Sequence, residues 1–446
     1  MASNVALTGL ARELKQRADS GKPVRIGLIG SGEMGTDIVT RARLMSGIDV
    51  AAIADIRVEN ATRAVDIAYR ETGHATVANS TDQLNAAMES GKVGVVEDAN
   101  QLLESGLIDV VIEATGLPGT GAELGIKAMK QGKHLVMMNV EADITIGSYL
   151  KNQADKLGVV YSLGAGDEPS SCMELIEFAS AMGHRIVSAG KGKNNPLNID
   201  ATPDAYQAEA DARNMNARML VEFVDGSKTM VEMAAIANAT GLIPDIPGMH
   251  GPAAGPDELA KTLIPEQDGG VLGEAGRVDY SVGKGLAPGV FVVVEAEHPR
   301  IWERMTDLKM GTGPYFSLVR PYHLTSLEVP LTCAKAVLHG KADMVPLDKP
   351  VAEVCAVAKK DLAVGATLDQ IGEYCYRAWI METVEAKTAL AIPCGLLAGS
   401  MVTRPIRKGE LITYANTTPP SDSRIVQLRA LQDQMIFGTR ETGIPS

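Results

Sequence analysis

Residues 24–39, VRIGLIGSGEMGTDIV, decide the fold of the N-terminal part of the chain. The apolar run 24–29 is typical of a buried strand, and residues 36–44 have the three-or-four spacing of an amphipathic helix. Between them, Gly30 to Gly35 follow the pattern G-x-G-x-x-G. The first glycine permits a tight turn, the second lets the backbone approach a pyrophosphate, and the third lets helix and strand pack closely. The stretch therefore predicts a dinucleotide-binding turn.

Short apolar strands alternate with helical patterns on both sides of this turn. The further strands expected are residues 50–54, 110–114, 135–138 and 159–163, and the further helices are 122–130 and 148–156. This alternation indicates a parallel sheet covered by helices, that is, a doubly wound Rossmann domain over residues 1–160 with an N-terminal helix. Residues 58–107 are interpreted as an insertion with helices at 81–89 and 99–105.

The rest of the chain divides into two further regions. Residues 161–344 are irregular, with Gly- and Pro-rich stretches at 243–256 and 269–276, and are expected to form an α+β substrate and dimerisation domain. Within them, Asp-Gly in residues 223–229 predicts a strand and hairpin. Residues 345–446 predict a small β-rich module with a returning helix at 424–434. Leu362, Gly365 and Leu368 there have the same spacing as Ile406, Gly409 and Ile412.

Composition limits the class of partner. The chain has 446 residues, enough for about three domains, and a formal charge of −13 that would repel nucleic acid and anionic membranes. No apolar run approaches the ~20 residues of a membrane-spanning helix, and residues 1–21 predict an amphipathic helix and no signal peptide. The five scattered cysteines favour buried thiols over a zinc site or disulfides. We expect a cytoplasmic enzyme of a small molecule.

Two residues after the second strand bear on the choice of cofactor. Asp55 stands where a carboxylate usually meets the adenosine ribose and favours NADH, whereas Arg57 suits the 2′-phosphate of NADPH. We favour NADPH. The expected cofactor contacts are Gly30, Ser31, Gly32, Glu33, Met34, Gly35, Asp55, Arg57, Ala114, Thr115, Gly116, Asn139 and Glu141.

Asp167 and Glu168 follow the last expected Rossmann strand, beside a Gly-rich turn. Adjacent carboxylates of this kind suit a hard divalent cation. Acidic residues before Pro169 suit the start of a helix equally well. The residues leave both interpretations open.

Local positive charge gathers in a few segments of this acidic chain. Lys191, with Lys193 and Asn194, is a candidate acid or clamp, and Asp225 with Lys228 is a candidate supporting pair. Residues 309–323 combine a Gly-rich backbone with a guanidinium and an imidazole, which suits a phosphate cradle. The expected substrate contacts are Lys193, Asn194, Lys309, Thr312, Tyr315, Arg320 and His323.

Five segments together resemble one family: residues 26–35, 110–116, 164–169, 225–229 and 309–315. They are similar to the homoserine-dehydrogenase-like oxidoreductases with a C-terminal SAF-type module, and within these to the deoxyxylulose-phosphate-reductoisomerase-like enzymes. The resemblance implies conversion of 1-deoxy-D-xylulose 5-phosphate to 2-C-methyl-D-erythritol 4-phosphate in the methylerythritol phosphate route to isoprenoids. It also implies NADPH, Mg²⁺ or Mn²⁺, a homodimer and inhibition by fosmidomycin.

The chain departs from the classical reductoisomerase. It lacks that enzyme's serine-rich cofactor turn and its separated acidic ligands. The assignment of Asp167 and Glu168 as metal ligands therefore depends on their local chemistry alone. From the residues themselves, the function is reduction of a small anionic carbonyl compound. A homoserine-dehydrogenase-like enzyme of another substrate and a non-catalytic dinucleotide sensor remain alternatives.

Overall fold

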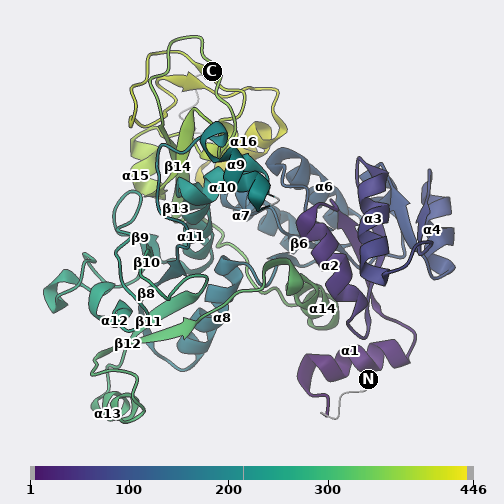
Figure 1. Ribbon diagram of the computed structural model, residues 1–446, viewed down its shortest axis with the longest axis horizontal. Coiled ribbons are helices and arrows are strands. Elements are labelled where there is room, and N and C mark those ends of the chain that lie inside the picture. Colours follow the sequence, from purple (N-terminus) through teal and green to yellow (C-terminus); the bar gives the residue numbers. More distant parts are fainter. Residues whose placement is uncertain (1–5, 214, 439–446) are drawn as a thin grey trace. The chain divides into compact units, whose positions relative to one another are not determined.

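The computed structural model describes residues 6–213 and 215–438 (Figure 1). Its contacts group these residues into two compact units. Unit 1 comprises Met1–Ala142, Leu150–Asp167 and Leu324–Val345, and unit 2 comprises Asp143–Tyr149, Glu168–His323 and Pro346–Ser446. The units follow contacts in space, so they do not coincide with the consecutive division at residues 160 and 344, which stays a prediction.

Unit 1 contains a seven-stranded sheet in the order β3-β4-β2-β1-β5-β6-β7, in which every pair is parallel. Its strands are β1 (Val24–Ile29), β2 (Ile48–Ala54), β3 (Ala75–Val77), β4 (Val93–Val96), β5 (Val110–Glu113), β6 (His134–Met137) and β7 (Tyr161–Leu163). This sheet confirms the expected α/β class. The helices expected in residues 58–107 are present as α4 (Thr81–Glu89) and α5 (Ala99–Glu104), but the segment also contributes β3 and β4 to the sheet, so its interpretation as an insertion was wrong.

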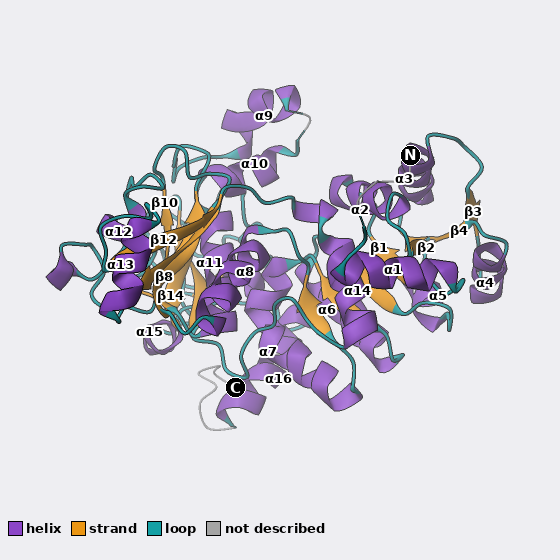
Figure 2. Ribbon diagram, turned by 90° about the horizontal axis from the view of Figure 1, so that it is seen from below, coloured by secondary structure: helices purple, strands orange, loops and turns teal. Residues whose placement is uncertain are grey.

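Helices cover both faces of this sheet (Figure 2). They are α1 (Gly9–Asp19), α2 (Glu33–Arg43), α3 (Val58–Tyr69), α4 (Thr81–Glu89), α5 (Ala99–Glu104), α6 (Pro118–Lys130), α7 (Val140–Leu157) and α14 (Val329–His339). Although α14 is distant in sequence, it lies against β1 and β6, and its Val329 and Cys333 belong to the core beneath the sheet (Figure 1). This packing explains why residues 324–345 belong to unit 1.

The strand order reverses between β1 and β5. From β1 the chain builds the sheet outward through β2, and it then returns to the other side of β1 with β5. Ligands of open α/β sheets bind at the carboxyl ends of the strands at such a switch point. Gly30 and Ala114, which follow β1 and β5, stand at this edge.

Unit 2 contains a mixed five-stranded sheet in the order β12-β11-β8-β10-β9. Its strands are β8 (Arg185–Gly192), β9 (Ile243–Pro244), β10 (Arg277–Ser281), β11 (Val290–Glu295) and β12 (Tyr315–Arg320). Helices α8 (Glu168–Ala181) and α11 (Ser227–Thr240) lie on one side and α12 (Leu259–Thr262) on the other (Figure 2). Helices α9 (Pro203–Ala212), α10 (Ala217–Val224) and α13 (Pro299–Asp307) complete this part.

The expected strand and hairpin at residues 223–229 is wrong. Asp225 and Gly226 instead form the corner between α10 and α11. Gly226 has φ +87°, a left-handed conformation that suits glycine, and it caps the start of α11. An Asp-Gly pair marks a tight turn in either setting, and the helical period of the apolar residues on both sides decides between them.

The C-terminal residues form β13 (Ala352–Ala358), β14 (Tyr376–Glu382), α15 (Thr383–Thr388), β15 (Met401–Val402), β16 (Thr417–Thr418) and α16 (Arg424–Phe437). The sequence echo is a structural repeat here. Leu362 and Ile406 exchange both backbone hydrogen bonds, at 2.8 and 3.0 Å, and Gly365 and Gly409 have nearly equal φ of +83° and +84°. The two halves are therefore related by a local pseudo-two-fold axis, while the SAF-type assignment stays a prediction.

Two expectations from composition can be compared with the structure. All five cysteines are buried thiols that form no disulfide, as expected. Within the described residues, we find no helix that combines the length and the apolar character needed to cross a bilayer.

Candidate functional site

The Gly-rich turn has the shape that a dinucleotide pyrophosphate requires. Gly30 has φ +96°, and a Cβ added there would lie 2.6 Å from the carbonyl oxygen of Ala114. A Cβ on Gly35 would lie 2.3 Å from the carbonyl oxygen of Gly30, whereas Gly32 faces open space at the N-terminus of α2. Glu33 and Met34 are exposed in the first turn of this helix. The turn is therefore tight where the backbone packs and open where a phosphate would approach.

Asp55 is engaged with the turn itself. Its Oδ2 accepts hydrogen bonds from the backbone N–H of Ser31 at 2.8 Å and the hydroxyl of Ser31 at 2.6 Å. Its Oδ1 accepts from the backbone N–H of Arg57 at 2.9 Å. The side chain of Arg57 is exposed at the N-terminus of α3. Asp55 thus braces the loop, and Arg57 presents its guanidinium to solvent.

The carboxyl ends of β5 and β6 carry the other expected cofactor residues. Ala114 and Thr115 are half-buried, Gly116 is exposed, Asn139 caps α7 by accepting from the N–H of Ala142 at 3.2 Å, and Glu141 follows in that helix. Glu113, which the sequence analysis missed, is fully buried and accepts from the N–H of Thr115 at 2.8 Å and from its hydroxyl. Burial raises the pKa of Glu113. The sequence signal that could have identified Glu113 is an acidic residue at the end of an otherwise apolar strand.

The second cluster of charged groups lies in unit 2, around Lys191 of β8. Lys191 is 7% exposed, and its Nζ lies 2.7 Å from Oε1 of Glu168, the first residue of α8. On its other side it contacts Glu232 of α11, whose side chain is 1% exposed. A buried ammonium held by two carboxylates is costly unless it is fully paired, as it is here.

This pairing sets the protonation of the cluster. Burial alone would lower the pKa of Lys191, but the carboxylates of Glu232 and Glu168 outweigh burial and raise it. Burial and the like charge of Glu168 raise the pKa of Glu232 to about 7. Lys191 therefore keeps its positive charge at neutral pH.

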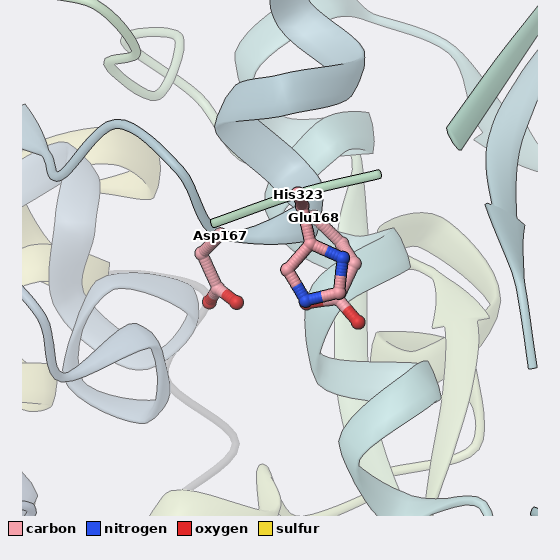
Figure 3. A group of neighbouring side chains, drawn as sticks. All are labelled: Asp167, Glu168 and His323. Carbon is pink, nitrogen blue, oxygen red and sulfur yellow. The ribbon is translucent and has the colours of Figure 1, made fainter. Parts of the chain in front are cut away.

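Glu168 also belongs to a group of potential metal ligands. Asp167, Glu168 and His323 each offer one ligand atom, and these atoms lie within 4.8 Å of one another (Figure 3). His323 Nδ1 lies 2.7 Å from the carbonyl oxygen of Pro288 and donates to it, so Nε2 is the ring nitrogen that faces the carboxylates. That Nε2 is 3.6 Å from Oε2 of Glu168. Two carboxylates and an imidazole form a donor set that fits a divalent cation such as Mn²⁺.

Lys193 and Asp225, which were expected to act near the substrate, contact different parts of the chain. Lys193 is buried, and its Nζ donates to the carbonyls of Asn195 and Phe223, both at 2.7 Å. Burial and the neighbouring Lys191 lower the pKa of Lys193 to about 8. Asn194 is exposed and Lys228 is half-buried in α11.

Asp225 is fully buried and forms an ion pair with Lys359 of the C-terminal region, at 2.6 Å. Its Oδ1 accepts from the N–H of Ser227 at 2.8 Å. The ion pair ties the corner between α10 and α11 to the residue after β13. Asp225 therefore supports the start of the helix that carries Glu232.

The structure does not bring together all parts of the expected phosphate cradle. Lys309 and Thr312 are exposed and precede β12, whereas Arg320 and His323 lie at or after its end, roughly 16 Å further along an extended strand. Tyr315, at the start of β12, donates to Asp268 at 2.7 Å. Only the far end of the segment reaches Glu168.

Arg320 itself lies beside α8. Its Nη1 is 3.0 Å from the hydroxyl of Ser171 and 2.9 Å from Oε2 of Glu174, and its guanidinium stacks over Tyr322 at 4.8 Å. Arg320 is therefore fixed in position near the first turn of α8, close in sequence to Glu168.

Comparison with known proteins places these sites in two recognised domains. Residues 26–163 match the family model of the homoserine dehydrogenase NAD binding domain, and residues 166–329 match that of the oxidoreductase DRL catalytic domain. These matches support the DRL-type oxidoreductase family. Both matched models describe oxidoreductase domains, and the first implies a nicotinamide cofactor.

Individual relatives are more distant. Homoserine dehydrogenase of Methylobacillus glycogenes is 28% identical over 118 residues, which is 26% of this chain and 25% of that protein. The chain thus matches only about a quarter of that relative. A probable dehydrogenase from Thermotoga maritima is 17% identical with a TM-score of 0.40, over 71% of this chain and 90% of that one.

A reductoisomerase structure described with fosmidomycin and magnesium is 15% identical with a TM-score of 0.34, over 47% of this chain and 56% of that one. Likenesses at this level carry no argument about activity.

Proposed function

We propose that the chain is an NADPH-dependent reductoisomerase that converts 1-deoxy-D-xylulose 5-phosphate to 2-C-methyl-D-erythritol 4-phosphate. One observation carries the proposal. The buried Lys191 is paired with Glu168, and Glu168 belongs to the ligand group with Asp167 and His323. This cluster lies within the residues that match the DRL catalytic domain.

The reaction needs an isomerisation and a reduction. The substrate first rearranges to a branched aldehyde of the same composition, and addition of a hydride and a proton then gives the alcohol. When bound, a divalent cation polarises the carbonyl oxygen and reduced nicotinamide supplies the hydride.

The residues have distinct proposed roles. Because its pKa is raised, Lys191 is better suited to stabilise developing negative charge on a substrate oxygen than to donate a proton. Asp167, Glu168 and His323 hold the cation. Arg320, already fixed beside α8, is proposed to contact the phosphate.

The decisive experiment measures NADPH oxidation with 1-deoxy-D-xylulose 5-phosphate and Mg²⁺ or Mn²⁺, with the product identified by NMR. We expect turnover that requires the cation and that fosmidomycin inhibits. Asp167→Asn and Glu168→Gln are expected to abolish turnover and to leave NADPH binding intact. Full activity in excess chelator would return both residues to a helix-capping role.

A second candidate is a dehydrogenase of a homoserine-like alcohol. The match of residues 26–163 to the homoserine dehydrogenase NAD binding domain favours it. Cation-independent oxidation of homoserine, without turnover of the sugar phosphate, would select this candidate instead.

A further inference from the structure

At the candidate metal centre, the carboxylate of Glu168 is shared between the ammonium of Lys191 and any cation bound there. Glu168 Oε1 lies 2.7 Å from Nζ of Lys191, while Oε2 faces Nε2 of His323 at 3.6 Å. Any cation held by Glu168 and His323 would therefore lie only a few ångströms from an ammonium group. Two positive charges at such a separation repel strongly in a site with little solvent.

Glu232 offsets this repulsion. It contacts Lys191 from α11, and at 1% exposure its charge is poorly screened by water. Glu168 and Glu232 both contact Lys191, so the two carboxylates together offset its ammonium charge, while Asp167 adds a further carboxylate to the ligand group. Without the carboxylate of Glu232, Lys191 would depend on Glu168, whose oxygens the cation also needs.

We propose that Glu232 is a positioning residue of the metal centre: it neutralises and holds Lys191, so that Glu168 keeps an oxygen for the cation. The proposal rests on the divalent cation of the proposed function and does not depend on which substrate is reduced. It assigns opposite effects to two residues in direct contact. Glu232 favours cation binding, and Lys191 opposes it.

The test is Mn²⁺ binding, measured by electron paramagnetic resonance and by calorimetry without substrate. Glu232→Gln keeps the size and polarity of the side chain but removes its charge, and it is expected to weaken Mn²⁺ binding about 10- to 100-fold. Lys191→Met removes the ammonium and is expected to tighten binding. The double variant, which has lost both charges, is expected to return close to the affinity of the wild type.

Glu295→Gln is the matched control. Glu295 pairs with Arg185 at 2.7 Å, at the opposite end of β8 from Lys191. Its substitution removes one carboxylate from an ion pair between β11 and the far end of β8, and Mn²⁺ affinity is expected to stay unchanged. NADPH titration and thermal unfolding of each variant check that the fold is retained. If Glu232→Gln fails to fold, Lys191→Met and the double variant still test whether Mn²⁺ affinity changes in the predicted directions.

Unchanged Mn²⁺ affinity in folded Glu232→Gln, or weaker binding in Lys191→Met, would overturn the proposal. The proposed function would then stand or fall by the separate assay with the sugar phosphate. Absence of Mn²⁺ binding in the wild type would overturn the proposal together with the metal centre. The predicted pattern of opposite effects would support the inference even if the substrate proved to be another carbonyl compound.

Discussion

At the scale of single residues, two neighbours after β2 have different roles in the cofactor turn. Asp55 braces the turn, and Arg57 is available to the cofactor. Asp55 accepts three hydrogen bonds from Ser31 and Arg57, so its carboxylate is largely committed to the protein. The exposed guanidinium of Arg57 is then the group best suited to a 2′-phosphate. This arrangement supports the proposed preference for NADPH.

Arg57→Ala is expected to weaken NADPH binding by about 1 to 3 kcal/mol, because a charge-assisted contact with the phosphate is lost. NADH, which lacks that phosphate, is expected to bind equally well to both proteins. Fluorescence titration with each cofactor gives the comparison. Equal losses for the two cofactors would refute the role assigned to Arg57.

Lys193 predicts a dependence of stability on pH. Its pKa is lowered to about 8 in the folded protein, mainly by burial, and returns to about 10.4 on unfolding. Between these values the unfolded chain binds more protons, so this residue makes the free energy of unfolding rise as the pH rises from about 8 to about 10.

Comparison of the melting temperatures of the wild type and Lys193→Met across this range checks the prediction. The melting temperature of the wild type is expected to rise relative to that of Lys193→Met as the pH rises. Lys341→Met, which removes an exposed lysine, serves as the control. A difference that does not vary with pH would contradict the prediction.

At the scale of elements, strand β12 divides the segment that the sequence analysis treated as one cradle. Arg320→Ala, at the end of the strand, is expected to lower kcat/KM for the sugar phosphate at least about tenfold, from a charged contact of roughly 1.5 to 3 kcal/mol. Thr312→Ala, before the strand, is expected to leave kcat/KM unchanged. Steady-state kinetics of both variants test this, and equal effects would restore the single cradle.

The sequence predicted elements best where the apolar period was long and regular. The strand Val24–Ile29 and the helix Thr81–Glu89 have the expected bounds. Strands β3 and β4 were missed although β5, β6 and β7 are equally short: β3 is an edge strand without a fully buried residue, and β4 contains Gly94. A run of that length does not show alternation, and its role is set by the neighbouring strands that it pairs with.

The candidate site was only partly predictable for a related reason. Asp167, Glu168 and Lys191 were found from local chemistry, but Glu232 was not, since it lies in the middle of a helix whose start had been interpreted as a hairpin. Contact between Glu232 and Lys191 joins residues from two distant elements. A single sequence carries the residue types of such a contact but not the packing that brings them together.

At the scale of the whole molecule, a buried ion pair anchors the last helix of unit 2. Arg429 of α16 forms two hydrogen bonds with Glu353 of β13, at 3.0 and 2.6 Å, and both side chains are at most 7% exposed. Arg429→Met leaves Glu353 buried without its partner, and it is expected to lower the free energy of unfolding by about 3 to 5 kcal/mol.

Replacement of both residues by Met is expected to recover much of this loss, because Glu353 is then no longer left as an unpaired carboxylate, and the other partner of Arg429, Asp433, is 20% exposed. Urea denaturation of the single and double variants measures the difference. A double variant no more stable than Arg429→Met would show that the pair contributes more than mutual neutralisation.

Helix α16 also determines when unit 2 can be completed during synthesis. Gln432 donates to the carbonyl of Thr145 at 3.1 Å and accepts from the N–H of Tyr149 at 3.0 Å, so a segment made early is held by one made late. The residues of unit 1, by contrast, end at Val345. On the ribosome, unit 1 has all its residues while unit 2 still awaits α16, and until then segment 143–149 lacks the helix that holds it.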